Sequence, residues 1–249
     1  MTAPQEINAI VSNEEWLEAR RALLEEEKAL TRQRDELSRK RRELPWVKVE
    51  TDYVFDGPEG PVPLSELFAG RTQLMIYHFM FGPEWAEGCP SCSMVADSIN
   101  GALVHIAHRD TTLAMVSRAP IGKIEAFRKR MGWNCMWVSS HGNSFNQDFH
   151  VSFTKDEIEK GEVYYNFGMN RFPKDEAPGL SVFYKDARGS IFHTYSAYAR
   201  GLEGLLGTYD LLDMTPKGRD EDHLPFTMAW VRHHDRYPDT ETAHSAGCH

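Results

Sequence analysis

Residues 73–107 read QLMIYHFMFGPEWAEGCPSCSMVADSINGALVHIA, and this stretch decides the fold. Gln73–Phe79 is a continuous apolar run, which is typical of a strand buried on both faces. Gly82–Gly88 has the composition of a loop, and apolar residues then recur with helical spacing over Cys92–Ala107. The stretch therefore predicts a strand, a loop and a helix, with the sequence CPSC at the start of the helix.

The sequence Cys89-Pro90-Ser91-Cys92 has the spacing of a redox-active dithiol. Pro90 suits the first helical position, because its missing N–H would have no partner there in any case. Free N–H groups and the positive end of the helix dipole would stabilise a thiolate at Cys89. Cys89 would then attack a disulfide, and Cys92 would be close enough to resolve the mixed disulfide.

The same spacing has two other interpretations. Zinc sites also use cysteine pairs two residues apart, but they need a second pair of ligands. Cys135 and Cys248 are single and far apart, so the chain has no second pair of this kind. Alternatively, both cysteines of the motif would be buried and unreactive. The position between a strand and a helix favours redox or metal chemistry.

Strands and helices alternate around this stretch. The other predicted elements are strands at Val47–Phe55, Thr112–Val116 and Cys135–Ser139, helices at Lys123–Met131 and Leu202–Leu212, and a hairpin of Leu180–Tyr184 and Ile191–Tyr195. This order, β–α–β and later β–β–α, implies an α/β domain with a mixed sheet flanked by helices. Residues 140–177 are polar and aromatic without a clear period, and we interpret them as an insertion with a short helix near Lys155–Lys160.

Residues 1–45 are predicted to form an N-terminal helical arm. Ser12 and Glu15 match a capping box, Pro45 ends the helix, and an apolar residue occupies every seventh position. These residues are Trp16, Leu23, Leu30, Leu37 and Leu44. One apolar position per heptad is half of a coiled-coil seam, so we expect the helix to lie along its domain or a partner subunit, with a homodimer as one form. The domain would then span residues 46–225, followed by a C-terminal tail at 226–249.

The composition excludes several classes of protein. The 249 residues are 41% hydrophobic and 26% charged, which excludes a fully disordered chain. A net charge of −9 disfavours a nucleic-acid partner. No apolar run approaches the roughly 20 residues of a membrane helix, so no membrane partner is expected. The N-terminal residues do not resemble a secretory signal, and four cysteines are too few for a secreted disulfide scaffold, so we expect a cytoplasmic protein.

Long stretches of the chain resemble the thioredoxin superfamily. Val62–Phe68 follows a strand and a glycine turn and is similar to the lead-in of the peroxiredoxin-like branch. More closely, YHFMFGPEWAEGCPSCS at 77–93, GLSVFYKDARGSIFHTYSAYARG at 179–201 and LLDMTPKGRDE at 211–221 resemble a bacterial thioredoxin-like family catalogued as a domain of unknown function. This resemblance covers nearly the whole chain and implies a thioredoxin-like fold.

The resemblance to thioredoxins also implies roles for single residues. Cys89 would be the nucleophile, Cys92 the resolving thiol, and Pro178 a cis-proline facing them, with the insertion just before it. The sequence departs from the thioredoxin motif, since Gly88 precedes Cys89 and the dipeptide between the cysteines is Pro-Ser. The peroxiredoxin pattern Pro-x-x-x-Thr-x-x-Cys is missing, so a peroxidase role has little support.

Two further residues are candidates for the site. Trp85 lies in the loop before the cysteines and would form one wall of a substrate groove, or simply anchor the loop. His193 lies on the second strand of the final hairpin. We hypothesise that it approaches the cysteines, as a proton acceptor or as a third ligand to a soft metal. The alternative is a half-buried strand histidine with a satisfied hydrogen bond.

The sequence thus predicts a thiol–disulfide oxidoreductase that needs no cofactor. Its substrate would be a thiol or disulfide, in a protein or a small molecule, and an external thiol reductant would reset the pair. The alternative is a copper-binding protein or a copper-dependent thiol oxidase that uses Cys89, Cys92 and His193.

Overall fold

The computed structural model describes residues 8–238. Contacts within the chain separate two compact units, with the boundary between Pro45 and Trp46. None of the helices within residues 8–238 combines the length and the apolarity needed to span a bilayer.

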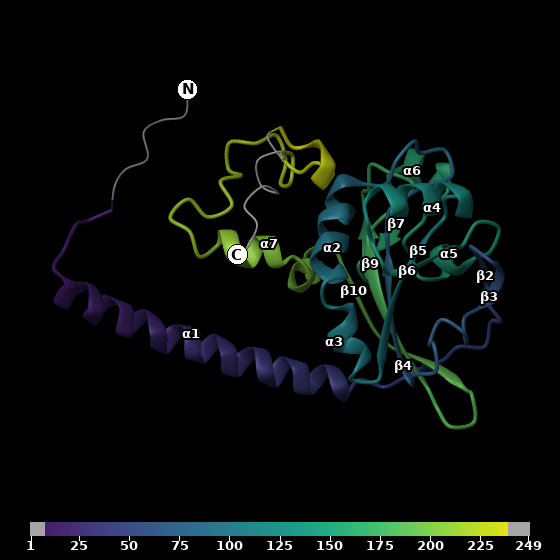
Figure 1. The fold of residues 1–249 in the computed structure, drawn as a ribbon, viewed down its shortest axis with the longest axis horizontal. Helices are drawn as coiled ribbons and strands as arrows, with labels where there is room; N and C mark the ends of the chain where they lie inside the picture. The colour runs from purple at the N-terminus through teal and green to yellow at the C-terminus, as the bar shows by residue number, and fades with distance from the viewer. Residues whose placement is uncertain (1–7, 239–249) are drawn as a thin grey trace, which may run out of the picture. The chain divides into compact units, whose positions relative to one another are not determined.

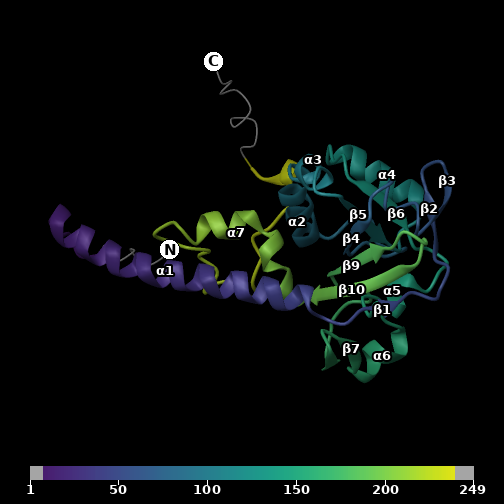
Figure 2. The same ribbon diagram turned by 90° about the horizontal axis from the view of Figure 1, so that it is seen from below.

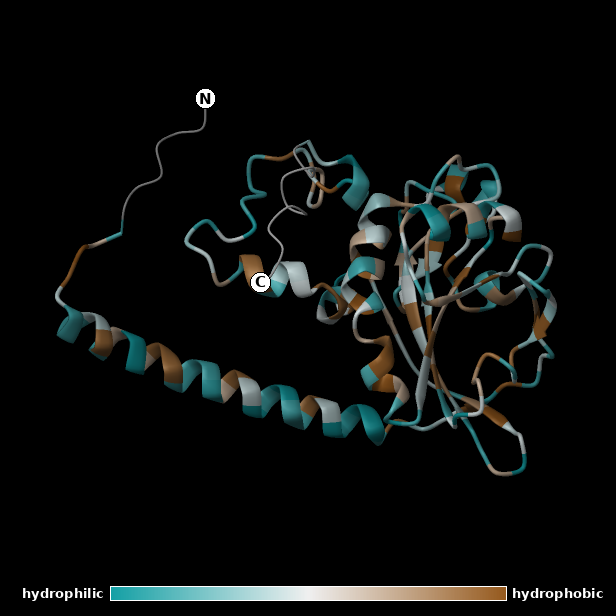
Figure 3. Ribbon diagram, in the orientation of Figure 1, coloured by the Kyte–Doolittle hydropathy of each residue, from teal (hydrophilic) through white to brown (hydrophobic). Residues whose placement is uncertain are grey.

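The N-terminal unit is a single long helix, α1 (Asn13–Arg42). The predicted capping box is present, because the Ser12 hydroxyl accepts the Glu15 N–H while the Glu15 carboxylate accepts the Ser12 N–H at 2.9 Å. None of the helical residues is buried, and apolar bands recur along the helix in Figure 3. The predicted apolar stripe is therefore exposed, with Leu23 at 50% and Leu30 at 54%.

The second unit is built on an eight-stranded mixed sheet (Figure 1). Its strands, in the order in which they lie, are β1 (Val47–Lys48), β10 (Ile191–Tyr198), β9 (Gly179–Lys185), β4 (Gln73–His78), β5 (Thr111–Ser117), β6 (Met136–Ser139), β2 (Val54–Gly57) and β3 (Gly60–Pro63). β4, β5 and β6 are parallel, whereas β9 is antiparallel to both β4 and β10. A parallel β–α–β unit followed by an antiparallel hairpin is the arrangement of the thioredoxin fold, as predicted.

Helices cover this sheet on both faces. The core on one face includes side chains of α2 (Pro90–Asn100), α4 (Ile121–Arg130) and α7 (Gly207–Leu212). The core on the other face includes Phe145 of α5 (Phe145–Asp148) together with Phe55 and Phe183. The two faces therefore have separate hydrophobic cores, and a side chain belongs to one or the other according to the direction in which it leaves its strand.

Three predicted elements are each divided in the structure. The helix predicted at Cys92–Ala107 is α2 followed by α3 (Leu103–Ala107), because the chain leaves the α2 helix at Gly101. The helix predicted at Leu202–Leu212 is a 3₁₀ helix, η1 (Ala199–Leu205), followed by α7. The strand predicted at Val47–Phe55 is interrupted, so that only β1 and the start of β2 are paired.

The insertion forms a small lobe with its own core. It contains α5, α6 (Lys155–Lys160) and the hairpin of β7 (Val163–Tyr165) and β8 (Gly168–Asn170). The short helix predicted at Lys155–Lys160 is confirmed, and a capping box between Thr154 and Glu157 begins it. Figure 2 shows α6 beside β7, where Ile158 packs against the core that includes Val163.

Part of the segment predicted as a C-terminal tail is packed onto the domain. Val231 and His233 are buried at 3% and 4% exposure, and a short 3₁₀ helix, η2 (His234–Arg236), follows them. The predicted tail is therefore anchored to the domain at Val231 and His233, whereas Phe226 at its start is 67% exposed. Cys248 and the rest of the tail lie outside the described residues.

Candidate dithiol site

The two cysteines of the motif lie where the loop after β4 enters α2. Cys89 is the N-cap residue of this helix, and Pro90 is its first residue, as the sequence predicted. The Cys89 N–H donates to the Met80 carbonyl at 3.0 Å. A Cβ atom at Gly88 would lie 2.6 Å from the Phe79 ring and 2.8 Å from the Phe127 ring, so only glycine fits. Close packing against two aromatic rings thus fixes the entry of the chain into α2.

The two thiols have opposite environments. Cys89 is partly exposed and Cys92 is buried at 2% exposure, and both are free thiols. A hydrogen bond from the Cys92 thiol lowers the pKa of Cys89, and the backbone N–H groups of Cys92 and Ser91 and the charge of Lys174 lower it further, against the effect of burial. Burial is the largest cause of a raised pKa at Cys92. The arrangement therefore favours a thiolate at Cys89 and a neutral thiol at Cys92.

The buried thiol also has a hydroxyl partner. Tyr77 lies on β4 beneath the loop, is 1% exposed, and forms a hydrogen bond with Cys92 through its side chain. Sequence analysis did not single out Tyr77, although its place in the strand directly before the loop is a signal that could have done so.

Trp85 lies between the dithiol loop and the end of the insertion. Its indole N–H donates to Asp175 Oδ1 at 3.2 Å, and the Lys174 ammonium lies 5.2 Å from the centre of its ring. Gly82 lets the ring approach closely, since a Cβ there would be 2.9 Å from the indole. Lys174 thus lies beside Trp85 and also close enough to Cys89 to lower the pKa of that thiol.

Pro178 lies near the end of β4, where the chain leaves the sheet toward the dithiol loop. This is because β9 begins at Gly179, which pairs with His78, the last residue of β4. The expected cis peptide bond is not observed, since every peptide bond in the described residues is trans. The Pro178 carbonyl instead accepts the Tyr165 hydroxyl at 2.7 Å. The prediction of a cis-proline is therefore wrong.

A buried ion pair lies just before this proline. Glu176 is 1% exposed and pairs with Arg118, and its other carboxylate oxygen accepts the Ser152 hydroxyl at 2.7 Å. Burial raises the pKa of Glu176 to about 7, although Arg118 opposes this effect. No sequence pattern indicated this pair, because Arg118 and Glu176 are brought together only by the fold.

The C-terminal segment holds the dithiol loop from the other side. A ring nitrogen of His233, Nε2, lies 2.8 Å from the Gly88 carbonyl. Arg130 joins the two segments, since it binds Glu87 at 2.7 Å and Asp235 at 2.7 Å. The loop that carries Cys89 is therefore held by residues about 40 and 145 positions further along the chain.

His193 does not approach the cysteines. It pairs with Phe183 across β9 and β10, and its ring contacts Phe149 and Phe183 in the core of the opposite sheet face. Within residues 8–238 no group of three or more His, Cys, Asp or Glu side chains could hold a metal ion. The predicted three-ligand copper site with His193 is therefore not formed, and its second interpretation, a half-buried strand histidine with a hydrogen bond, is correct.

These features define the class of protein as a thioredoxin-fold protein with two free thiols at the N-terminus of α2. A family model described as "Bacterial protein of unknown function (DUF899)" matches residues 5–237, and the chain belongs to this family. A comparison with curated proteins gave no match.

Several solved structures are similar to this chain at low identity. Peroxidoxin BcpB from Mycobacterium tuberculosis is 13% identical over 66% of this chain and 95% of that chain, with a TM-score of 0.44. Peroxiredoxin Q from Xanthomonas campestris is 14% identical over 63% and 88%, with a TM-score of 0.43. A secreted disulfide oxidoreductase from Mycobacterium tuberculosis, homologous to E. coli DsbE, is 16% identical over 63% and 92%, with a TM-score of 0.34.

Proposed function

We propose that this protein is a thiol–disulfide oxidoreductase that uses Cys89 and Cys92. The observation that carries the proposal is the difference between the two thiols, since Cys89 is accessible with a lowered pKa and Cys92 is buried with a raised pKa. A nucleophilic thiol must be a thiolate, whereas a resolving thiol must stay neutral until the mixed disulfide has formed. The low cysteine content suits the cytoplasm, where we place the reaction.

The reaction balances as two thiol–disulfide exchanges. The Cys89 thiolate attacks one sulfur of a substrate disulfide, a bond forms between the two sulfurs, and the other substrate sulfur leaves as a thiolate that takes up a proton. Cys92 then loses its proton and attacks the Cys89 sulfur, which expels the second substrate thiolate and leaves a Cys89–Cys92 disulfide. Two electrons from an external thiol reductant return this disulfide to two thiols.

Two residues close to the dithiol loop are suited to bind the substrate. Trp85 offers a partly exposed indole ring beside the loop, and the Lys174 ammonium lies over it at 5.2 Å. Pro178 lies at the same edge of the sheet, where β9 begins. We propose that Trp85 and Pro178 contact the groups attached to the substrate disulfide.

Turnover of a disulfide tests this proposal. Cys89→Ser should abolish reduction of a small aromatic disulfide, and Cys92→Ser should trap the mixed disulfide, which mass spectrometry detects. Cys135→Ser is the matched control, because Cys135 is buried and burial raises its pKa to about 12. Full turnover by the Cys89→Ser variant would refute the assignment.

A redox titration separates this proposal from metal binding. A reversible transition of the Cys89–Cys92 pair between about −120 and −270 mV, followed by alkylation and mass, supports an oxidoreductase. Thiols that resist alkylation until a chelator is added would instead indicate a soft metal such as copper(I), held by the two sulfurs alone.

We further propose that α1 forms a homodimer with a second, antiparallel copy. None of the residues of α1 is buried, and a stripe of leucines along it is exposed. Acidic residues are concentrated in the first half of the helix and basic residues in the second half. Residues 13–27 contain six acidic and two basic residues, whereas residues 28–42 contain two acidic and seven basic residues. Antiparallel pairing brings the acidic half of each copy against the basic half of the other.

The mass of the chain in solution tests this dimer. Light scattering should give twice 28.5 kDa for the natural chain and 28.5 kDa for Leu30→Asp. Thr31→Asp adds the same charge beside the stripe and should leave the dimer intact. A natural chain of monomer mass would refute self-association.

A further inference from the structure

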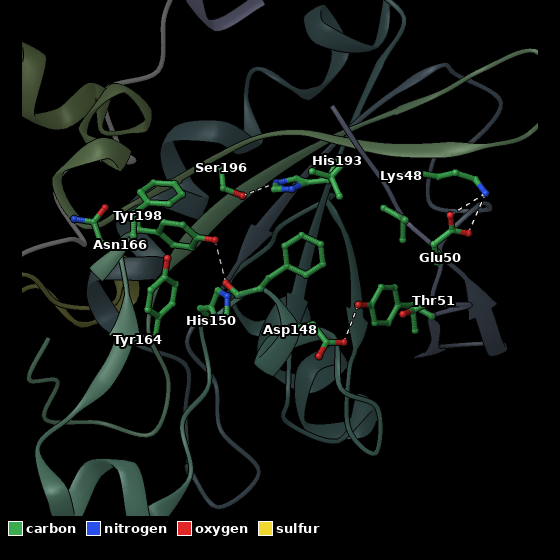
Figure 4. Close-up of a pocket in the computed structure, with 15 residues that line it drawn as sticks. Lys48, Glu50, Thr51, Asp148, His150, Tyr164, Asn166, His193, Ser196 and Tyr198 are labelled. Carbon is green, nitrogen blue, oxygen red and sulfur yellow. Dashed lines mark hydrogen bonds and ion pairs between the residues drawn. The ribbon is translucent and has the colours of Figure 1, made fainter. Parts of the chain in front are cut away.

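A cavity opens on the sheet face opposite the thiols. It has a volume of about 390 Å³ and lies within the second unit, between the segment after β1, the turn after α5, the β7–β8 hairpin and β10. Figure 4 shows aromatic rings and a few polar groups around it. Small-molecule sites have this size and this mixture of apolar walls with few polar groups.

Most charges at this pocket already have partners. The Lys48 ammonium lies 2.9 Å from the Glu50 carboxylate. The Asp148 carboxylate accepts the hydroxyls of Tyr53 and Ser144, both at 2.7 Å. The partners of Asp148 are neutral hydroxyls, so its negative charge remains and disfavours an anionic ligand, while the Lys48 charge is already matched by Glu50.

The hydrogen bonds of His193 define what its ring can offer to a ligand. Its Nε2 lies 3.0 Å from the Tyr195 carbonyl, which can only accept, so Nε2 carries the ring hydrogen. Nε2 also lies 2.8 Å from the Ser196 hydroxyl, which can donate in turn to Ser181 at 3.0 Å. Nδ1 then keeps a lone pair, and within residues 8–238 it has no hydrogen-bond partner. Burial lowers the pKa of His193, which keeps the ring neutral.

The backbone at the pocket is unusual. His150, Asn166 and Phe167 line the pocket and have φ values of +55°, +53° and +63°, in the left-handed region that favours glycine. Asn166 and Phe167 form the two-residue turn between β7 and β8, where glycine is the common second residue.

The sequence instead holds an aromatic ring at this strained position. The Phe167 ring lies 5.4 Å from that of Tyr198 and is 67% exposed. The contact with Tyr198 is the only ring contact of this exposed phenylalanine within residues 8–238, and residues with strained backbone of this kind cluster at ligand sites.

We propose that this pocket binds a small neutral phenol. The ring of the ligand packs among the aromatic side chains of Phe149, Phe167 and Tyr198, and its hydroxyl donates a hydrogen bond to Nδ1 of His193. A neutral imidazole nitrogen without a proton requires a donor from the ligand, which a phenol has and its methyl ether lacks.

A series of matched ligands tests the proposal on the full chain. Phenol, anisole and toluene have similar rings, but only phenol donates a hydrogen bond. Titrations followed by NMR shifts should show that phenol binds about tenfold more tightly than anisole, the factor expected for one hydrogen bond. Equal affinities of phenol and anisole, or shifts at residues away from the pocket, would overturn the proposal.

Two variants locate the binding site. His193→Phe keeps an aromatic ring against Phe149 and Phe183 and should remove the preference for phenol over anisole. Phe167→Gly relieves the turn and removes one wall, so it should weaken both ligands while the melting temperature is kept or raised. This second variant decides the test if His193→Phe does not fold, and unchanged affinity in Phe167→Gly contradicts the proposal. Cys89→Ser should bind phenol normally, which separates this site from the dithiol.

Discussion

Cys89 should become reactive at a lower pH than an ordinary cysteine. Its pKa is lowered from 9.0 to about 6, chiefly by the hydrogen bond from Cys92 and by backbone N–H groups. At pH 7 about nine-tenths of such a thiol is ionised, compared with about 1% of a thiol at 9. A low pKa also weakens the thiolate as a nucleophile, by about twentyfold over three pKa units. These two effects leave a gain of only about fivefold in the alkylation rate at pH 7.

At pH 6 the balance is different. About half of Cys89 is ionised there, against about 0.1% of an ordinary thiol, and the gain in rate rises to about 25-fold after the same correction. The pH profile is therefore a sharper measurement than a single rate. We expect alkylation of Cys89 by iodoacetamide, followed by peptide mass, to be half-maximal near pH 6.

Two variants assign the causes of this shift. Cys92→Ala removes the hydrogen bond to the Cys89 thiolate, which is the largest cause, so the midpoint of the profile should move to higher pH. Lys174→Gln removes a nearby positive charge, which is a smaller cause, and should move the midpoint to higher pH by less. Cys135, which is buried, should stay unmodified throughout and serves as an internal control. A midpoint near pH 9 in the natural chain, or no change in Cys92→Ala, would refute the reasoning.

Three further predictions concern the surroundings of the thiols. The pKa of Glu176 rises from 4.5 to about 7 on folding, so between these pH values the native state holds a proton that the unfolded state has lost. The free energy of unfolding should therefore fall by roughly 3 kcal/mol as the pH rises from 4.5 to 7. Urea titrations of Glu176→Gln should lack this fall. Tyr77→Phe keeps the ring but loses the hydroxyl at Cys92, so the mixed disulfide with a substrate should persist longer, while alkylation of Cys89 is unchanged. Arg130→Ala breaks the links to Glu87 and Asp235 and should lower the stability by about 1 kcal/mol and expose residues 231–238 to proteolysis; unchanged cleavage would contradict this role.

Local patterns predicted the centre of the fold well. The apolar strand, the loop and the helix that carries Cys89 are contiguous in sequence, and a proline at the first helical position marks the boundary without reference to the rest of the chain. The capping boxes of α1 and α6 are equally local. These signals need only spacing and residue type, which the sequence supplies directly.

The failures have a different physical origin. Alternation along a regular strand would put His193 and Tyr195 on the same face, but β10 has an irregularity between them, so that His193 pairs with Phe183 and Tyr195 with Val182. Phe183 and Val182 face opposite cores, and the histidine follows Phe183 away from the thiols. A register shift in one strand thus separates His193 from the face on which Tyr195 lies, and nothing in the local sequence marks it.

Long-range contacts were beyond the sequence for another reason. Arg118 and Glu176 are 58 positions apart, and His233 is 145 positions from Gly88. Neither pair belongs to a repeating pattern, and each forms because the sheet and α2 bring distant loops to one edge. The cysteine motif identifies which atoms can react and supplies most of what lowers the pKa of Cys89, whereas the contact of His233 holds the loop that carries this thiol. The CxxC sequence therefore predicts the chemistry and the main causes of the lowered pKa at Cys89, and the distant residues add the charge of Lys174 and the contacts that hold the loop.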